Sequence, residues 1–319
     1  MSSSKRSLSE TTVQEETTSL STASAGNKIA NAVNETFMSL TCNFADLPSW
    51  LQDNHDILRG YRRPTFSYIK CAKSLFYLHN ESGAVGFIVL AFTTYIYTLS
   101  STSSVKWWDF LVFYCFLAGA MICLSLSSLF HTFCCHSEKV CADWNRCDYI
   151  GIVTLIVGSF YPMIYYGFYC NSVLQIVYLS LISVFGIATI IVAVAPTFRS
   201  PEFRWFRTGL FLSMGLSAVF PIGHAIALYG IHLCFDVISL KHMLIMGLFY
   251  VVGAIIYGCR VPERWYPGKF DIWGASHQIF HVCVVSAAVV HYHGVILAMS
   301  YWHKENHECK VDIRLMQPS

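Results

Sequence analysis

The stretch Asp109–Phe130 reads DFLVFYCFLAGAMICLSLSSLF and is followed directly by His131. After Asp109 it contains no charged side chain. A helix needs about 20 apolar residues to cross roughly 30 Å of hydrocarbon, so this stretch predicts a membrane-spanning helix. Ionisable groups at bilayer depth are costly and are usually functional, so His131 becomes a candidate site residue.

The composition of the whole chain supports the same class of protein. Hydrophobic residues make up 55% of the 319 residues, charged residues 13%, and the mean hydropathy is +0.48. A soluble domain needs more polar surface than this, so the chain is predicted to be an integral membrane protein. A net charge of +2 provides no basic field for nucleic acid, which argues against a nucleic-acid partner.

Seven apolar runs are long enough to span a bilayer. They are Gly83–Ser100, Asp109–Phe130, Tyr149–Tyr169, Val173–Ala195, Phe206–Tyr229, Leu240–Gly258 and Trp273–Ser300. The predicted fold is therefore all-α, a bundle of seven transmembrane helices. Four parts are expected: a disordered Ser/Thr-rich cytosolic N-terminus (1–45), a cytosolic juxtamembrane segment (46–82), the membrane domain (83–300) and a short non-cytoplasmic tail (301–319).

The orientation follows from the positions of the cations, because Lys and Arg of short loops stay on the cytoplasmic side. Most precede the first span or lie in alternate loops: Arg59, Arg62, Arg63, Lys70, Lys73, Lys139, Arg146, Arg199, Arg204, Arg260, Arg264 and Lys269. The opposite loops hold little beyond Lys106 and Lys241, although the tail carries three cations. This predicts a cytoplasmic N-terminus and a C-terminus outside.

With this topology, three histidines and one carboxylate fall at the same depth, near the cytoplasmic ends of three spans. They are His131, Asp148, His277 and His281. His277 and His281 are four residues apart and so share a helix face, as do Ser127 and His131. Three imidazoles suit Zn²⁺ and leave the fourth tetrahedral position for water, whose pKa zinc lowers to about 7. Asp148 would hold that water or act as general base.

A weaker interpretation stands beside this one. The chain contains 13 histidines, so two of them four residues apart arise readily by chance. A single histidine such as His131 is often only a hydrogen-bonded group at the interface. His291 lies about 15 Å beyond His281 along a helix, too far to bind the same ion. Together with His224 and His293 it is predicted to be a packing or pore-side residue.

Several motifs together resemble the progestin and adipoQ receptor family, which is haemolysin-III related. They are DLPSW at 46–50, SSLFHT at 127–132, HSEKV at 136–140, LIVGSF at 155–160 and PERWYPGKFDIW at 262–273 followed by SHQIFHV at 276–282. The resemblance covers the chain from about Asp46 to Ser300. Within the family, the chain is most similar to the fungal branch linked with membrane zinc homeostasis, itself similar to adiponectin receptors.

The resemblance implies a fold, a site and a chemistry. The seven helices would be inverted relative to those of G-protein-coupled receptors, with a cavity for a lipid chain. Zinc ligands would be His131, His277 and His281, with Asp148 and Ser127 beside the water that zinc holds. The expected reaction is hydrolysis of a ceramide-type amide, with zinc or Ser127 stabilising the oxyanion.

One departure from the family pattern concerns the first span. After His79-Asn80-Glu81-Ser82 the family continues with a polar Asn-Ile-aromatic-Ser/Thr-His stretch, whereas this chain passes directly to Gly83. The first helix is therefore expected to be shorter and to lack a polar patch, which bears on lipid access.

Three functions stay open at this point. The first is a zinc-dependent lipid amidase acting in sphingolipid metabolism, signalling and zinc homeostasis. The second is a receptor for an extracellular protein or sterol ligand with a purely structural zinc, which direct coordination by Asp148 would favour. The third and weakest is a zinc or proton transporter, since the spans carry few ionisable groups. The expected location is the plasma membrane or an internal membrane such as the endoplasmic reticulum, and oligomeric state is not indicated.

The 13 cysteines contain no CxxC pair and predict no zinc ribbon. One predicted cytosolic loop contains four cysteines and a histidine: Cys134, Cys135, Cys141, Cys147 and His136. The cysteines are expected to be reduced thiols, and the alternatives are a second metal site or palmitoylation. Cys170, Cys234 and Cys309 fall on the outer side, where one disulfide is expected without a preferred pair.

Overall fold

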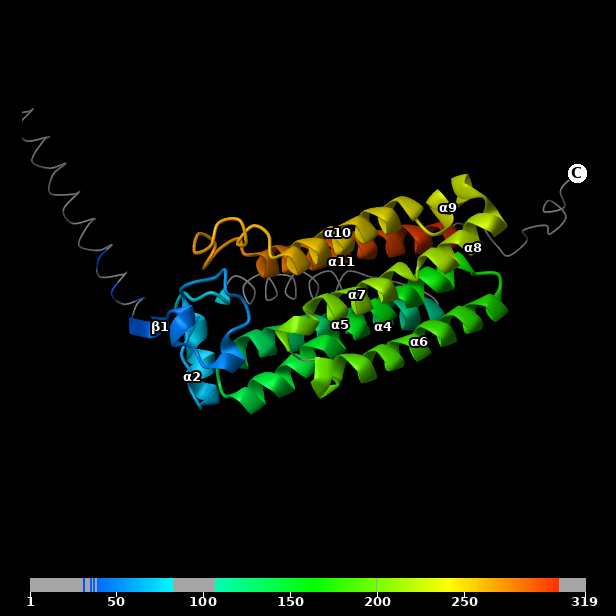
Figure 1. The fold of residues 1–319 in the computed structure, drawn as a ribbon. Coiled ribbons are helices and arrows are strands. Elements are labelled where there is room, and N and C mark those ends of the chain that lie inside the picture. Colours follow the sequence, from blue (N-terminus) through cyan, green and yellow to red (C-terminus); the bar gives the residue numbers. More distant parts are fainter. Residues whose placement is uncertain are drawn as a thin grey trace, which may run out of the picture.

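Long helices lying side by side form the body of the protein, and a small irregular cap covers one end of them (Figure 1). The computed structural model describes residues 39–82, 107–198 and 200–303, together with Asn31, Glu35 and Phe37. Its helices in the body are α4 (Trp107–Phe133), α5 (Glu138–Gly167), α6 (Ser172–Val194), α7 (Arg204–Leu216), α8 (Val219–Tyr229), α9 (Ile231–Val237), α10 (Leu240–Cys259) and α11 (Ser276–His303).

Six segments among the described residues are long and apolar enough to cross a membrane. They are Trp107–Phe133, Glu138–Gly167, Ser172–Ala193, Arg204–Tyr229, Leu240–Cys259 and Ser276–His303. These six coincide with the second to seventh predicted runs, which confirms the helical, multi-pass class. The first predicted run, Gly83–Ser100, lies outside the described residues.

The third predicted span begins much earlier than its apolar run indicates. The run was placed at Tyr149–Tyr169, but α5 begins at Glu138. Its first three turns are mostly polar and carry Lys139 and Arg146, two residues that hydropathy predicts to lie in a loop. Hydropathy locates only the part of a helix that lies in hydrocarbon, so it does not detect such an extension.

The fifth predicted span consists of two helices, because Pro221 interrupts it. A proline has no N–H to donate and its ring clashes with the carbonyl four residues earlier, here that of Ser217. The chain makes a turn at Ser217 and Ala218, where Phe220 N–H bonds to the Ser217 carbonyl at 3.1 Å. Pro162, by contrast, lies within an unbroken α5.

Helices α4 and α5 pack with their backbones in contact, because glycines lie at their interface. A Cβ atom at Gly119 would lie 2.8 Å from the Thr154 carbonyl oxygen, and one at Gly158 would lie 2.8 Å from that of Cys115. Near the cap, a Cβ at Gly151 would lie 2.9 Å from the Cα of Cys123. Small residues permit this close approach in membrane bundles.

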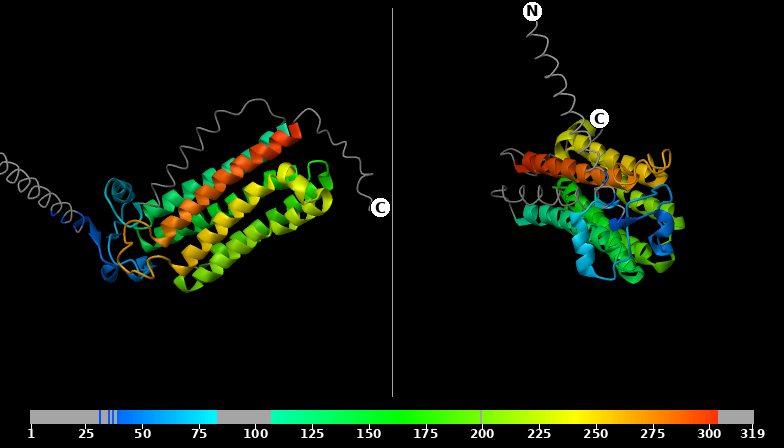
Figure 2. Two further views of the ribbon diagram at one scale, coloured as in Figure 1. Left: turned by 90° about the horizontal axis from the view of Figure 1, so that it is seen from above. Right: turned by 90° about the vertical axis from the view of Figure 1, so that its left-hand side faces the viewer.

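The cap consists of residues 39–82 and the loop 260–275 between α10 and α11, which lie together at the same end of the bundle (Figure 2). Its elements are β1 (Thr41–Cys42), paired antiparallel with β2 (Tyr61–Arg62), the 3₁₀ turns Phe44–Asp46, Ser49–Leu51 and Ser74–Phe76, and the helix α2 (Tyr68–Lys73). Cys42, Leu47, Ile57, Tyr61 and Ala275 form its small apolar core. The structured part of the cap therefore begins before the predicted boundary at Asp46.

At the opposite end, a buried carboxylate joins three helices. Asp109 of α4 accepts a hydrogen bond from the Tyr166 hydroxyl of α5 at 2.9 Å and lies 3.0 Å from the Nε2 of His303 on α11. The indole of Trp302 donates to the Tyr166 carbonyl at 3.0 Å. These partners extend α11 beyond Ser300, where the sequence placed its end.

The structure tests part of the prediction that Cys170, Cys234 and Cys309 include one disulfide. Cys170 is disulfide-bonded, whereas Cys234 is a free, buried thiol and therefore does not belong to that bond. Cys309 lies outside the described residues.

Candidate metal centre

Three histidines from two helices converge where the bundle meets the cap. One ligand atom of each of His131, His277 and His281 lies within 4.8 Å of the others. His131 lies in the last turn of α4, while His277 and His281 occupy successive turns at the start of α11. The ring centroids of His277 and His281 are 4.8 Å apart, as the spacing of four residues predicts.

The arrangement fits a tetrahedral metal ion. The Nε2 atoms of His131 and His281 are 3.1 Å apart. Two nitrogens bound to one tetrahedral zinc at 2.0–2.1 Å are about 3.3 Å apart, so only a small adjustment is required. His131 and His281 are buried and His277 is partly buried, so these nitrogens are shielded from competing water.

A glutamate of the cap orients His131, and no sequence pattern indicated its role. The carboxylate of Glu81 lies 2.5 Å from Nδ1 of His131. A carboxylate accepts but does not donate, so Nδ1 carries the proton and Nε2 is left free to bind a metal. Metal-binding histidines commonly donate their second N–H to such a carboxylate. Glu81 immediately follows His79-Asn80 in the sequence. Its position just before the first predicted span was the one signal that could have marked this carboxylate as a site residue.

The electrostatics of Glu81 agree with this role. Burial alone would raise the pKa of its carboxyl group, but the electrostatic attraction and hydrogen bond of the His131 imidazole outweigh burial and hold that pKa well below its usual range. Its neighbour His79 is fully buried, and burial lowers the pKa of that imidazole to about 3. Nδ1 of His79 accepts the Glu81 backbone N–H at 3.1 Å, which holds Glu81 in position.

Arg62 connects the cap to the end of α4. Its guanidinium donates to the backbone carbonyls of His131 at 2.5 Å and Thr132 at 3.0 Å, and to the Ser74 hydroxyl at 2.8 Å. The last carbonyls of a helix lack partners within the helix and attract cations. This buried arginine therefore fixes the end of α4 that carries the first histidine.

Glu263 fixes the start of α11, the helix that carries His277 and His281. Its buried carboxylate accepts the backbone N–H of Ser276 at 2.7 Å, and also the Ser276 hydroxyl. The amide of Asn54 donates to it at 3.1 Å. An anion at a helix N-terminus is favourable, and here it positions the residue that precedes His277.

Gln278 holds the same turn from the other side. Its amide donates to the carbonyls of Ile272 at 2.7 Å and Asn80 at 3.2 Å, and it accepts from the Gly274 N–H at 2.8 Å. In the segment SHQIFH, two residues thus anchor the helix and the two histidines face the centre. Spacing alone predicted the histidines but not the anchors.

Asp148 and Ser127 lie beside the histidines without joining their group. Both are buried, and their side chains interact across the α4–α5 contact. Asp148 also interacts electrostatically with His131. Within the described residues the group that could hold a metal ion contains the three histidines alone, so Asp148 adjoins the candidate centre rather than completing it.

Other candidates named from the sequence lie elsewhere. His291 is buried against Phe116, with ring centroids 4.6 Å apart, and does not belong to the metal-binding group. Cys134, Cys135, Cys141, Cys147 and His136 form no second metal-binding group in the described part of the chain.

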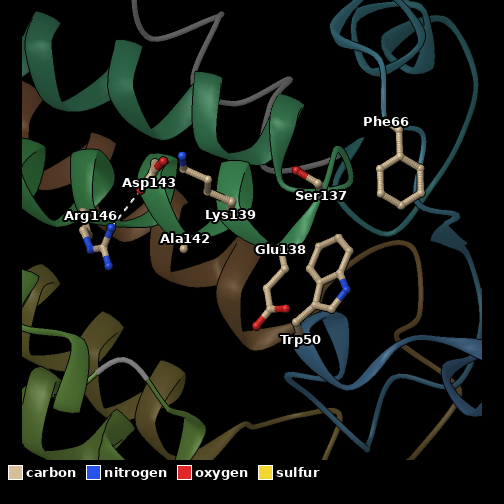
Figure 3. A pocket seen from close by; sticks show the side chains of 8 residues that line it. All are labelled: Trp50, Phe66, Ser137, Glu138, Lys139, Ala142, Asp143 and Arg146. Atoms are coloured by element: carbon tan, nitrogen blue, oxygen red, sulfur yellow. Dashed lines mark hydrogen bonds and ion pairs between the residues drawn. The ribbon is translucent and has the colours of Figure 1, made fainter.

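A cavity of about 730 Å³ opens at the cap end (Figure 3), and none of the three histidines lines it. It lies between the cap and the polar start of α5, and Trp50, Phe66, Ser137, Glu138, Lys139, Ala142, Asp143 and Arg146 line it. Asp143 and Arg146 pair with each other at 2.8 Å on its wall. The cavity therefore does not serve the metal centre.

A Glu81→Gln substitution tests the orientation of His131. The amide keeps the shape of the side chain but weakens the charge-assisted bond, so zinc affinity is expected to fall about 10- to 100-fold. Competition with a chelator of known affinity measures the change. Glu138→Gln, an exposed glutamate at the cavity, is the matched control and should bind zinc like the unsubstituted protein. Equal affinity in both variants would contradict the role of Glu81.

Comparisons with known proteins agree with this architecture. The chain is 43% identical over 277 residues to the "Adiponectin receptor protein" of Drosophila melanogaster, covering 85% of this chain and 62% of that protein. It is 40% identical over 265 residues to the "ADIPOR-like receptor IZH2" of Saccharomyces cerevisiae, covering 81% and 84%. It is 38% identical over 274 residues to the "Heptahelical transmembrane protein 1" of Arabidopsis thaliana, covering 81% of each.

The matched length differs among these relatives. The chain spans about three fifths of the fly relative and most of the yeast and plant relatives. Residues 77–292 match the haemolysin-III related family, and this range includes Glu81, Asp148 and the three histidines. The chain belongs to the haemolysin-III related family, that of the progestin and adipoQ receptors.

Proposed function

We propose that this protein is a zinc-dependent hydrolase that cleaves the amide bond of a ceramide-type membrane lipid. The observation that carries the proposal is the set of three converging imidazoles with one tetrahedral position left over. A structural zinc normally has four protein ligands, and Asp148 lies outside the ligand group. Because the centre lies at the ends of helices long and apolar enough to cross a membrane, a lipid is the substrate class that reaches it most directly.

The proposed topology completes the bundle with a first span at Gly83–Ser100 and places the N-terminus in the cytoplasm. The cap would then face the cytosol. The names of the plant relatives, which describe heptahelical proteins, support seven spans. The plasma membrane or the endoplasmic reticulum is the proposed location.

The side chains around the centre have distinct roles in the proposed reaction. Zinc held by the three histidines would polarise the amide carbonyl and lower the pKa of a water molecule to about 7. Asp148 takes a proton from the attacking water and delivers it to the departing amine. The Ser127 hydroxyl donates to the carbonyl oxygen as negative charge develops there. The carbon–nitrogen bond breaks, releasing a fatty acid and a sphingoid base.

Asp148→Asn separates catalysis from metal binding. The amide cannot accept the proton, so the rate of fatty-acid release from ceramide should fall at least 100-fold, the lower range for a general base. Zinc content should stay near one ion per chain, because all three ligands remain. Mass spectrometry of protein in lipid nanodiscs measures the product, and metal analysis measures zinc.

Asp143→Asn is the matched control, since Asp143 lies on the same helix but is exposed. Its activity should equal that of the unsubstituted protein, and chelation should abolish it. Bound zinc without any release of fatty acid would instead favour a receptor with structural zinc. Release that survives both chelation and Asp148→Asn would contradict the proposed mechanism.

A further inference from the structure

Two cysteines from distant parts of the chain meet where the cap contacts the end of α4. The Sγ atoms of Cys71 and Cys135 are 3.6 Å apart. Cys71 belongs to α2 of the cap, and Cys135 follows the last residue of α4 by two positions. Both are free thiols and both are buried. A disulfide has an S–S distance of about 2.05 Å, so a relative movement of about 1.5 Å would bring the sulfurs to bonding distance.

The backbone around the pair is held in register. Thr65 N–H donates to the Cys135 carbonyl at 2.9 Å, and Phe66 N–H donates to the His136 carbonyl at 3.0 Å. These bonds fix the cap segment before α2 against the residues after α4. The Ser67 hydroxyl accepts from Lys70 N–H at the start of α2, which positions the turn that bears Cys71.

The two thiols differ in acidity. The Cys135 thiol donates to the Cys71 sulfur, and together with the nearby Thr65 hydroxyl, 3.0 Å away, it outweighs burial and lowers the pKa of Cys71 to about 6. The same hydrogen bond and burial raise the pKa of Cys135. A thiolate is the reactive form of cysteine. Cys71 is therefore suited to react first with an oxidant, and Cys135 to react afterwards with the oxidised Cys71.

We propose that Cys71 and Cys135 are a redox site, which a hydroperoxide converts into a disulfide that ties the cap to the end of α4. With hydrogen peroxide, the Cys71 thiolate attacks one peroxide oxygen, the O–O bond breaks, and Cys71 becomes a sulfenic acid while the departing hydroxide takes up a proton and leaves as water. The Cys135 thiol then attacks the Cys71 sulfur, forming the S–S bond and releasing a second water. Two electrons pass from the sulfurs to the peroxide, and a thiol reductant reverses the change.

The adjacent Cys134 has a different environment and does not take part. Its sulfur lies 3.3 Å from the Arg62 guanidinium and 3.6 Å from the His131 carbonyl. Burial raises its pKa. Ser137, two residues after Cys135, and Phe66, five residues before Cys71, line the cavity, so solvent approaches the chain beside Cys135. The proposal does not rest on zinc chemistry, although the disulfide would form only four residues after His131.

Peptide mapping of the full chain in nanodiscs tests the pair. Reduced protein is treated with increasing hydrogen peroxide, free thiols are alkylated, and non-reducing digests are analysed by mass spectrometry. A peptide linked through Cys71 and Cys135 should appear and should vanish on reduction. Cys71 should be oxidised at least about 10-fold faster at pH 7 than Cys42, another buried cap thiol, whose pKa is raised by burial.

Three single variants make the test specific. The linked peptide should be absent in Cys71→Ser and in Cys135→Ser, and Cys135→Ser should retain a sulfenic acid at Cys71. Cys134→Ser, the matched control, should form the linked peptide as the unsubstituted protein does. A link through Cys134, or oxidation of Cys71 without any link in the unsubstituted protein, would overturn the proposal. Neither result depends on whether the protein hydrolyses ceramide.

Discussion

His281→Ala is expected to remove stoichiometric zinc and, with it, amide hydrolysis. The substitution deletes the nitrogen that lies 3.1 Å from Nε2 of His131 and leaves two imidazoles. Loss of a residue that only hydrogen-bonds to a metal ligand lowers metal affinity about 10- to 100-fold. Loss of a direct ligand should therefore lower zinc affinity by more than about 100-fold. Metal analysis of purified protein and chelator competition measure this.

His291→Ala is the matched control for that substitution. His291 lies on the same helix and is also buried. Its removal opens a cavity beside Phe116 but leaves the metal-binding group intact, so zinc should remain at one ion per chain. If His281→Ala and His291→Ala bound zinc equally well, the proposed ligand set would be wrong.

Gly151→Leu is expected to separate α4 from α5 beside the metal centre. Even a Cβ at Gly151 would lie 2.9 Å from the Cα of Cys123, a backbone atom that cannot rotate away. Overpacking typically costs 1–3 kcal/mol, and a leucine against backbone should reach about 3 kcal/mol. Thermal unfolding in nanodiscs measures the loss of stability. Gly247→Leu in α10 is the control, because a Cβ there meets nothing within 4 Å.

The same substitution makes a functional prediction. Asp148 lies one turn before Gly151, and Ser127 lies one turn after Cys123, so the two side chains would move apart. The three histidines belong to α4 and α11 and should keep their zinc. Hydrolysis should therefore fall while zinc content is unchanged. Unchanged hydrolysis in a destabilised Gly151→Leu protein would show that the Ser127–Asp148 contact is dispensable.

Hydropathy predicted the helix segments that contact lipid well. It predicted poorly the segments whose structure depends on contacts within the protein. Apolar runs located six segments of the described structure that are long enough to cross a membrane. They did not reveal the polar start of α5 at Glu138 or the turn before Pro221, because these depend on local hydrogen bonding and not on contact with hydrocarbon.

For the site, the sequence alone determined the membrane class, the shared face of His277 and His281 and, through the predicted topology and the family resemblance, the partnership with His131. Helical periodicity and the cost of ionisable groups in lipid are properties of short segments, so they can be recognised without a fold. Only the tertiary structure decided that Glu81 orients His131, that Arg62 and Glu263 fix the helix ends, and that Cys71 meets Cys135. Each of these contacts joins the cap or its loop to a helix end, and such pairings depend on how the chain packs in three dimensions.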